Sequence, residues 1–170
     1  QDFPAALRAL AEKADVVIEG EVCRQESFAE ELSGHIRMAN VVSVKTAIKG
    51  GKTDTLVILT EGGQLEGRVQ VHSHSPRLSL GQSSIFMLQA AKQRWGSGAP
   101  CYELAGGNSG IVSRLAADRD KEAYCPGTGG KAKSWRAVRE EIGLWCGKDF
   151  RLPPAAGRSS QSSELCIKLA

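Results

Sequence analysis

Apolar and polar residues alternate along much of this chain with a period of two, the spacing of β-strands that bury one face. The longest alternation runs from His35 to Ile48, with Arg37, Ser43 and Lys45 on its polar side. Its other face carries Ile36, Met38, Asn40, Val42, Val44, Thr46 and Ile48. Further strands are predicted at Asp15–Cys23, Thr55–Thr60, Gly67–Val71 and Ser84–Gln89. The pattern therefore predicts a mainly β protein, with the apolar Thr55–Thr60 strand covered on both faces.

Two segments instead have helical spacing and lie near opposite ends of the strand region. Asp2 caps the first helix, and Ser134 caps the second. The apolar stripe of the first is Phe3, Leu7, Leu10 and Ala14, and that of the second is Trp135, Val138, Ile142 and Trp145. Each stripe predicts a helix that covers the strands with one face.

Glycine and proline divide the strands, and no regular β-α-β alternation is present. Around Gly106-Gly107-Asn108, two short strands are expected to form a hairpin. An order of helix, five to seven short strands and helix favours a small OB-like barrel. We expect one domain over residues 1–147 and an irregular tail over residues 148–170, held by a disulfide.

Charge does not point to nucleic acid. Lys and Arg total 22 against 19 for Asp and Glu, and the net charge of +3 is spread along the chain. No basic segment interleaves with aromatic residues. No apolar run approaches the ~20 residues that span a bilayer, so no membrane span is expected.

The five cysteines are widely separated, with no CxxC pair and no zinc-ligand spacing. Such cysteines favour disulfides and a secreted or periplasmic location, the alternative being reduced, buried thiols in a cytosolic protein. Pairing Cys101 with Cys125 and Cys146 with Cys166 leaves Cys23 over. Any of the other four cysteines could instead be the odd one, because sequence alone does not fix the connectivity.

Several segments together resemble a known module. These are ADVVIEGEV, a strand ending VKTAIKG, TEGG, a turn leading to IFML, and GGNSGIV before a helix. They resemble a β-barrel module of secreted bacterial proteins, similar to the OB-type barrel of netrin-like domains and tissue inhibitors of metalloproteinases. The resemblance covers about residues 14 to 145 and implies a fold more than an activity.

Metalloproteinase inhibitors of that kind carry a cysteine at the mature N-terminus that reaches the zinc of the target enzyme. Here Gln1 is first and the earliest cysteine is Cys23. No inhibitory residue is therefore carried over to this chain.

Three groups of residues suggest chemistry, but each has a simpler interpretation. His72 and His74 have the spacing of two metal ligands, but no third ligand is evident and they fall opposite Val69 and Val71, on the solvent side. Ser109 in GNSG resembles the nucleophile region of some serine peptidases, without a histidine in a matching context. The early glutamates, Glu19, Glu21, Glu30 and Glu31, are expected to form a solvated strand face and a polar loop.

These observations predict a secreted or periplasmic, non-catalytic module without cofactor or metal, whose partner is a protein, with a peptidase as the first candidate. The expected contact surfaces are the loops Gln25–Gly34, Gly62–Glu66 and His72–Leu80, with His72, His74 and Pro76 foremost. The alternatives are a serine hydrolase that uses Ser109 and a structural domain of a larger secreted protein.

Overall fold

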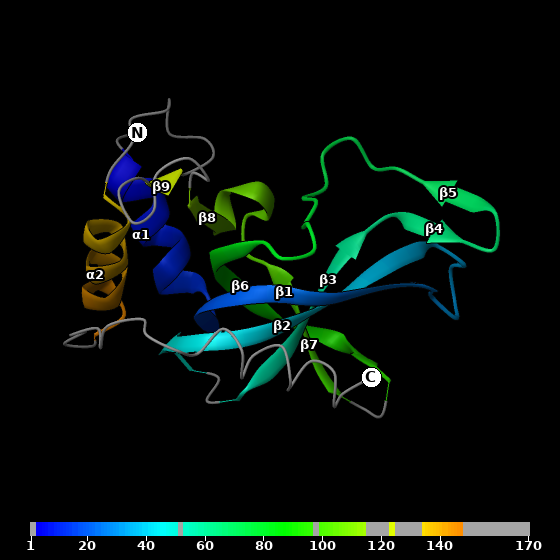
Figure 1. Ribbon diagram of the computed structural model, residues 1–170, viewed down its shortest axis with the longest axis horizontal. Helices are drawn as coiled ribbons and strands as arrows, with labels where there is room; N and C mark the ends of the chain where they lie inside the picture. Colours follow the sequence, from blue (N-terminus) through cyan, green and yellow to red (C-terminus); the bar gives the residue numbers. More distant parts are fainter. Residues whose placement is uncertain (1–2, 51–52, 97–98, 115–122, 125–133, 148–170) are drawn as a thin grey trace.

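The computed structural model describes residues 3–50, 53–96, 99–114, 123–124 and 134–147. Within these residues the chain is mainly β, with one helix before the strands and one after them (Figure 1). The elements in chain order are α1 (Phe3–Lys13), β1 (Val16–Ala29), β2 (Ile36–Lys49), β3 (Thr55–Glu61), β4 (Gly63–Leu65), β5 (Arg68–Gln70), β6 (Ser83–Trp95), β7 (Ala99–Leu104), the 3₁₀ turn η1 (Gly107–Gly110), β8 (Ile111–Arg114), β9 (Ala123–Tyr124) and α2 (Trp135–Trp145). The sequence-based prediction of a mainly β chain with two flanking helices is confirmed.

Five strands pair in a ring. The sheet order β1-β2-β3-β7-β6 is joined at its ends by a pairing of β1 with β6, in which Val17 lies opposite Met87. Only β3 and β7 run parallel within this ring, with Val57 opposite Cys101; its other pairs are antiparallel. Each of the five strands thus has two neighbours, and β8 continues the pairing along β6.

One face of the ring strands forms a continuous apolar core. It includes Val22 of β1, Val42 of β2, Ile58 of β3 and Phe86 of β6, none of which is exposed to solvent. Val42 and Val44 of β2 contribute to this core from even positions, as predicted, but Ala39 and Val41 on the other face are buried as well. A run of buried residues in β3 confirms that both of its faces are covered.

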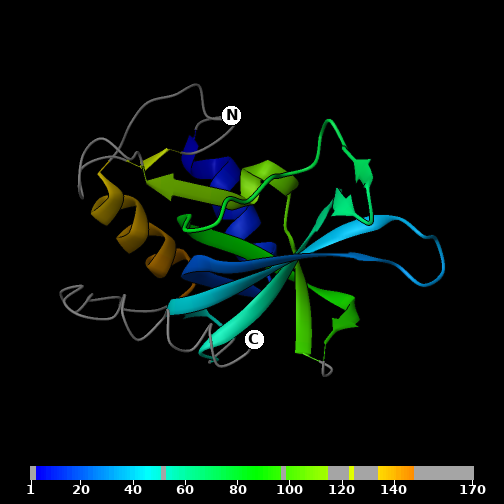
Figure 2. The ribbon, with the colours of Figure 1, turned by 45° about the vertical axis from the view of Figure 1, so that its right-hand side comes forward.

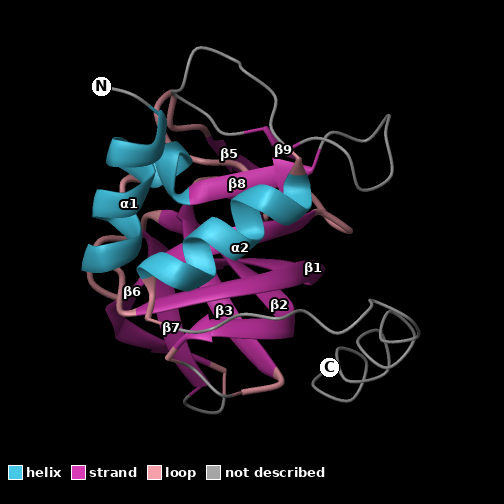
Figure 3. Ribbon diagram, turned by 90° about the vertical axis from the view of Figure 1, so that its left-hand side faces the viewer, coloured by secondary structure: helices cyan, strands magenta, loops and turns pink. Residues whose placement is uncertain are grey.

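The helices cover a second face of the same strands (Figure 3). Leu7 of α1 and the predicted α2 residues Trp135, Val138 and Ile142 pack with Val17 and Met87. Ser134 caps α2 as predicted, since its hydroxyl accepts a hydrogen bond from the backbone N–H of Ala137. Leu7, Leu10 and Ala14 of the first stripe and the second stripe therefore face the side that their spacing indicates. The predicted Asp2 cap and the Phe3 side chain lie outside the described residues.

Glu19 departs from its prediction. Expected on a solvated strand face, it is 4% exposed, and its carboxylate lies 2.7 Å from the guanidinium of Arg139 on α2. The sheet face that would otherwise be wet is covered by α2, and Arg139 supplies the charge that a buried carboxylate requires. Short-range alternation could not show this partner.

The strand boundaries and one connection also differ from the prediction. β1 continues to Ala29 and β6 to Trp95, so Gln25 belongs to a strand and the loop after β1 is shorter than expected. The two strands around Gly106 do not form a hairpin: β7 and β8 both pair with β6, one after the other. The predicted tail over residues 148–170 lies outside the described residues.

Candidate functional site

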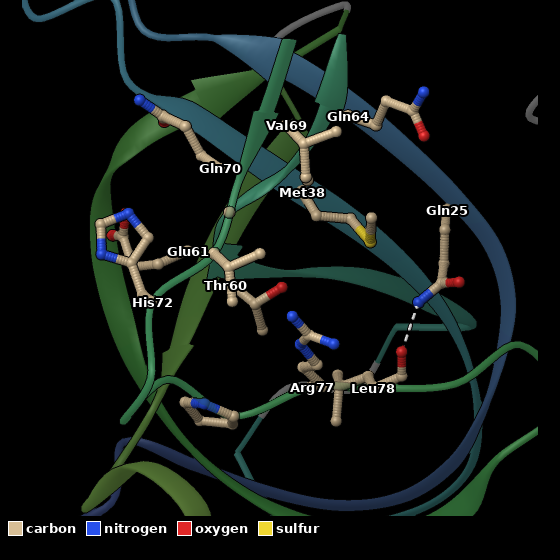
Figure 4. A pocket seen from close by; sticks show the side chains of 14 residues that line it. Gln25, Met38, Thr60, Glu61, Gln64, Val69, Gln70, His72, Arg77 and Leu78 are labelled. Atoms are coloured by element: carbon tan, nitrogen blue, oxygen red, sulfur yellow. Dashed lines mark hydrogen bonds between the residues drawn. The ribbon is translucent and has the colours of Figure 1, made fainter.

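A pocket of about 300 Å³ lies where β2 and β3 meet the β4–β5 hairpin (Figure 4). The β4–β5 hairpin lies at the end of the sheet away from the helices (Figures 1 and 2). The pocket is lined by Gln25, Met38, Thr60, Glu61, Gly62, Gly63, Gln64, Val69, Gln70, Val71, His72, Pro76, Arg77 and Leu78. Eight of these fourteen residues lie in the three segments predicted as contact surfaces, but the first segment contributes only Gln25, which belongs to β1. The other six are Met38, Thr60, Glu61, Val69, Gln70 and Val71.

The inner side of the pocket is fixed by a hydrogen-bonded amide network. Gln25 Nε2 donates to Asn40 Oδ1 at 2.9 Å and to the Leu78 carbonyl at 2.7 Å. Buried Asn40 in turn donates to the Ile58 carbonyl at 2.9 Å and to Thr60 Oγ1 at 3.0 Å. Because buried amides are costly when unpaired, this network holds β1, β2, β3 and the Leu78 segment in one arrangement.

The β4–β5 hairpin is closed by a two-residue turn and is attached to the β1–β2 end. Glu66 and Gly67 both have positive φ, at 49° and 75°, as a type I′ turn requires. Ile36 donates its backbone N–H to Gln70 Oε1 at 2.6 Å. Gly63, with φ of 144°, lies so near β1 that a Cβ there would approach Ser27 Oγ to 2.5 Å. Glycine at this position thus permits the close approach that shapes the pocket wall.

Beside the pocket, Arg37 sits in a cluster of carboxylates that we call the Arg37 network: Arg37, Glu30, Glu61, Gln93 and Glu103. Its guanidinium lies 3.1 Å from Glu30, 3.1 Å from Glu61 and 2.9 Å from Glu103. It also donates to Gln93 Oε1, and Gln93 donates to Glu30 at 2.7 Å. The prediction that Arg37 lies on a polar side is corrected in one respect: its side chain is only 7% exposed.

The network shifts two titration equilibria. The hydrogen bond from Gln93, followed by that from Ser33 and the charge of Arg37, lowers the pKa of Glu30 below its ordinary value of 4.5. Burial alone would lower the pKa of Arg37, but its hydrogen bond to Glu103 and the charges of Glu61, Glu103 and Glu30 outweigh that effect and raise it. Both groups therefore stay charged at neutral pH.

The rim of the pocket combines exposed apolar side chains with cationic ones. Val69 and Val71 are 64% and 63% exposed. Arg77, which lines the pocket, is also exposed, and among the described residues it makes no ion pair; Arg68 is exposed as well but does not line the pocket. Glu61, by contrast, is occupied by Arg37. The rim is thus suited to a ligand that has both apolar and acidic groups.

The structure brings together some of the predicted contact residues. His72 and Pro76 line the pocket, and His74 does not. Val69 and Val71, expected opposite the solvent side, are exposed instead, because the hairpin leaves the main sheet and their side chains face the pocket. Sequence reasoning missed Met38 and Thr60, which lie near the ends of otherwise buried strands. Arg77 follows Pro76 within the predicted His72–Leu80 contact loop.

Two candidate chemistries find no assembled site. Ser109 is exposed on η1, and no hydrogen bond in the described part of the chain joins it to His35, His72 or His74. In the same part of the chain, no group of three or more His, Cys, Asp or Glu side chains is arranged to hold a metal ion.

The predicted disulfides remain untested, since Cys125 and Cys166 lie outside the described residues. Cys23 is disulfide-bonded. The odd cysteine is then one of the other four, which is among the choices that the sequence left open.

None of the described helices has the length and apolar composition needed to cross a membrane. Comparison of the chain with protein-family models and with curated proteins gives no match.

Proposed function

We propose that this chain is an extracytoplasmic, non-catalytic module that binds another protein at the pocket between the β4–β5 hairpin and the ends of β2 and β3. The observation that carries the proposal is one pocket rim where the exposed Val69 and Val71 lie beside Arg77, which makes no ion pair among the described residues. Loops on a rigid scaffold commonly carry recognition. Exposed apolar side chains next to cations are typical of surfaces that bind proteins.

We further propose that the scaffold is a small closed barrel of OB type. The ring of pairings through β1, β2, β3, β7 and β6 supports this, as do the single parallel pair and the apolar face that all five strands share. A closed ring leaves no free edge among its own strands, so the surface elements attached to it are the parts open to a partner.

The extracytoplasmic location is proposed from the widely spaced cysteines and supported by the disulfide at Cys23. A peptidase is our first candidate for the partner, following the resemblance to inhibitor-type barrels. The non-catalytic role is proposed because the residues that line the pocket include no assembled nucleophile and base.

The test is a pull-down from the extracytoplasmic fraction of the native host with three proteins: wild type, Val71→Asp and Leu144→Asp. Leu144 on α2 is 66% exposed, nearly the same as Val71, and lies outside the pocket. Each retained protein is identified, purified and titrated against all three forms. We expect at least about tenfold weaker binding for Val71→Asp, as for an interface position that gains a buried charge, and unchanged binding for Leu144→Asp.

A retained peptidase would also be assayed for inhibition by the wild-type chain. Equal binding by all three proteins would place the interface elsewhere, and retention of nothing would overturn the module proposal.

A further inference from the structure

The outer edge of β5 has hydrogen-bonding groups that the fold does not use. Arg68 lies opposite Leu65 across the two-residue turn, and this closing pair exchanges hydrogen bonds. Hydrogen-bonded and non-hydrogen-bonded pairs alternate in an antiparallel ladder, so Val69, opposite Gln64, is a non-hydrogen-bonded position. Its N–H and C=O therefore point away from β4, toward the open side.

The same alternation continues to Val71, just beyond the end of β5. Within the described residues, no backbone hydrogen bond is made by Val69 or Val71 outside the β4–β5 ladder. β5 pairs only with β4, and in Figure 1 it is the outermost strand of the hairpin. An edge of this kind is a template for an added strand.

The side chains beside this edge define what such a strand should carry. Val69 and Val71 stand on the same face of the extended segment, and both line the pocket. Figure 4 shows the guanidinium of Arg77 directed into the pocket near Thr60. Arg77 makes no ion pair among the described residues, whereas the only carboxylate that lines the pocket, Glu61, is paired with Arg37.

We propose that β5 binds an extended peptide segment of the partner protein as an added strand, with an apolar side chain against Val69 and Val71 and an acidic side chain on Arg77. This inference rests on the proposed function and assigns its mode of binding. Main-chain hydrogen bonds to Val69 and Val71 supply affinity, and the pocket supplies the preference for side chains. Arg68 precedes Val69 in the strand and does not line the pocket, so Arg77 carries the charge preference.

The probe is a library of random twelve-residue peptides displayed on phage, selected against the intact wild-type chain. We expect selected peptides to alternate apolar residues at every second position and to contain an Asp or Glu. With a synthetic copy of a selected peptide bound, amide hydrogen exchange at Val69 and Val71 should slow by at least about tenfold, as for amides that enter a ladder.

Four variants separate the backbone contribution from the charge contribution. Val69→Pro removes the outward N–H without breaking a β4–β5 hydrogen bond, and it also fixes φ and replaces the isopropyl group by the proline ring. Val69→Thr changes the side chain but keeps that N–H, and shows how much of the loss comes from the side chain. We expect about tenfold weaker peptide binding for Val69→Pro and less than about threefold for Val69→Thr. Arg77→Glu should lose at least about tenfold for acid-bearing peptides, whereas Arg136→Glu, at an exposed arginine of α2, should change nothing.

A thermal unfolding transition checks that each variant is folded. If Val69→Pro does not fold, Arg77→Glu, at an exposed residue, still tests the proposal. Strand addition is overturned if the selected peptides bind Val69→Pro and Val69→Thr equally well, or leave the two amides unprotected. It is also overturned, with the proposed function intact, if no peptide is selected while the pull-down partner is still retained in a Val71-dependent way. Failure of both experiments removes both proposals.

Discussion

Next to the pocket, the guanidinium of Arg37 forms ion pairs with three carboxylates from three parts of the chain. Glu30 follows β1, Glu61 ends β3, and Glu103 lies in β7. An arginine can do this because its donors form a planar fork that a lysine lacks. The network thereby fixes the Glu61 end of the pocket wall through a residue that does not itself line the pocket.

At single positions, the sequence predicts which apolar residues are buried better than it predicts which charged residues are buried. Ile36, Val42 and Ile48 of β2 are buried as their alternation indicates, but Ser43, predicted on the polar side, is buried too. The burial of Glu19 and Arg37 depends on Arg139 and Glu103, which are distant in sequence. The exposure of Val69 and Val71 likewise depends on where the hairpin lies. Alternation indicates which residues of a strand share a face. Whether that face is buried depends on elements from elsewhere in the chain.

The Arg37 network predicts an acid-dependent loss of stability. Because the folded-state pKa of Glu30 is lowered, its contribution is fully present above the unfolded value near 4.5 and is lost as pH falls through the folded value. Glu30→Gln should therefore lower the free energy of unfolding at pH 7 by about 1 kcal/mol and flatten its decline below pH ~4.5.

Urea unfolding at a series of pH values measures this effect. Glu31→Gln removes an adjacent exposed carboxylate outside the Arg37 network and is the control, for which no such flattening is expected. Parallel pH profiles for wild type and Glu30→Gln would contradict the prediction.

At the scale of elements, the strands were located from sequence but several ends were not. β1 and β6 run past the predicted ends because polar positions such as Gln25 and Gln93 still have partners in the ladder or the networks.

In the GNSG segment, the sequence predicts the turn but not the reason why each glycine is required. Gly106 and Gly107 use positive φ, as its turn composition suggests, but Gly110 is needed for space: a Cβ there would lie 2.2 Å from the Ala105 carbonyl oxygen.

Two substitutions in this one turn should therefore differ in cost. Gly110→Ala forces a backbone displacement between β7 and β8, and we expect a loss of about 3 kcal/mol, the upper end for overpacking. Gly107→Ala meets no atom nearer than 4.0 Å and bears only the strain of φ at 59°, about 1 kcal/mol. Chemical denaturation of both variants gives the comparison, and equal losses would show that Gly110 is not limited by contact.

At the scale of the whole molecule, the sequence predicts a mainly β chain with a helix on either side, and the structure confirms this. The sequence does not predict that β1 pairs with β6 or that β3 pairs in parallel with β7, because no local pattern indicates which strands become neighbours. The pocket was anticipated only in part, through its loops. Its inner network required Gln25, Asn40 and Thr60 to be seen side by side.

Cysteine pairing is the prediction that belongs to this scale. Peptide mapping under non-reducing conditions, on protein isolated from its native host, should find Cys23 in a disulfide and two disulfides in total, including Cys101 with Cys125. The short loop closed by Cys101 and Cys125 contributes roughly 3 kcal/mol in the chain-entropy account. Thiol alkylation of the same sample without reductant is the control, and five reactive thiols would end the extracytoplasmic proposal.

The ring of strands also constrains the order in which its strand pairs can form during synthesis. Val17 of β1 pairs with Met87 of β6, and Ile58 of β3 pairs with Tyr102 of β7. Neither pairing can form until the later strand has been synthesised. A ribosome must have released the chain through Leu104 before the last of these pairs can form. Long-range pairings of this kind slow folding, and until then β1, β2, β3 and β6 can form only an open sheet with apolar faces and a β3 edge that lacks its partner β7. A chaperone that shields this edge during synthesis would act on the nascent chain alone, because the finished ring no longer presents it.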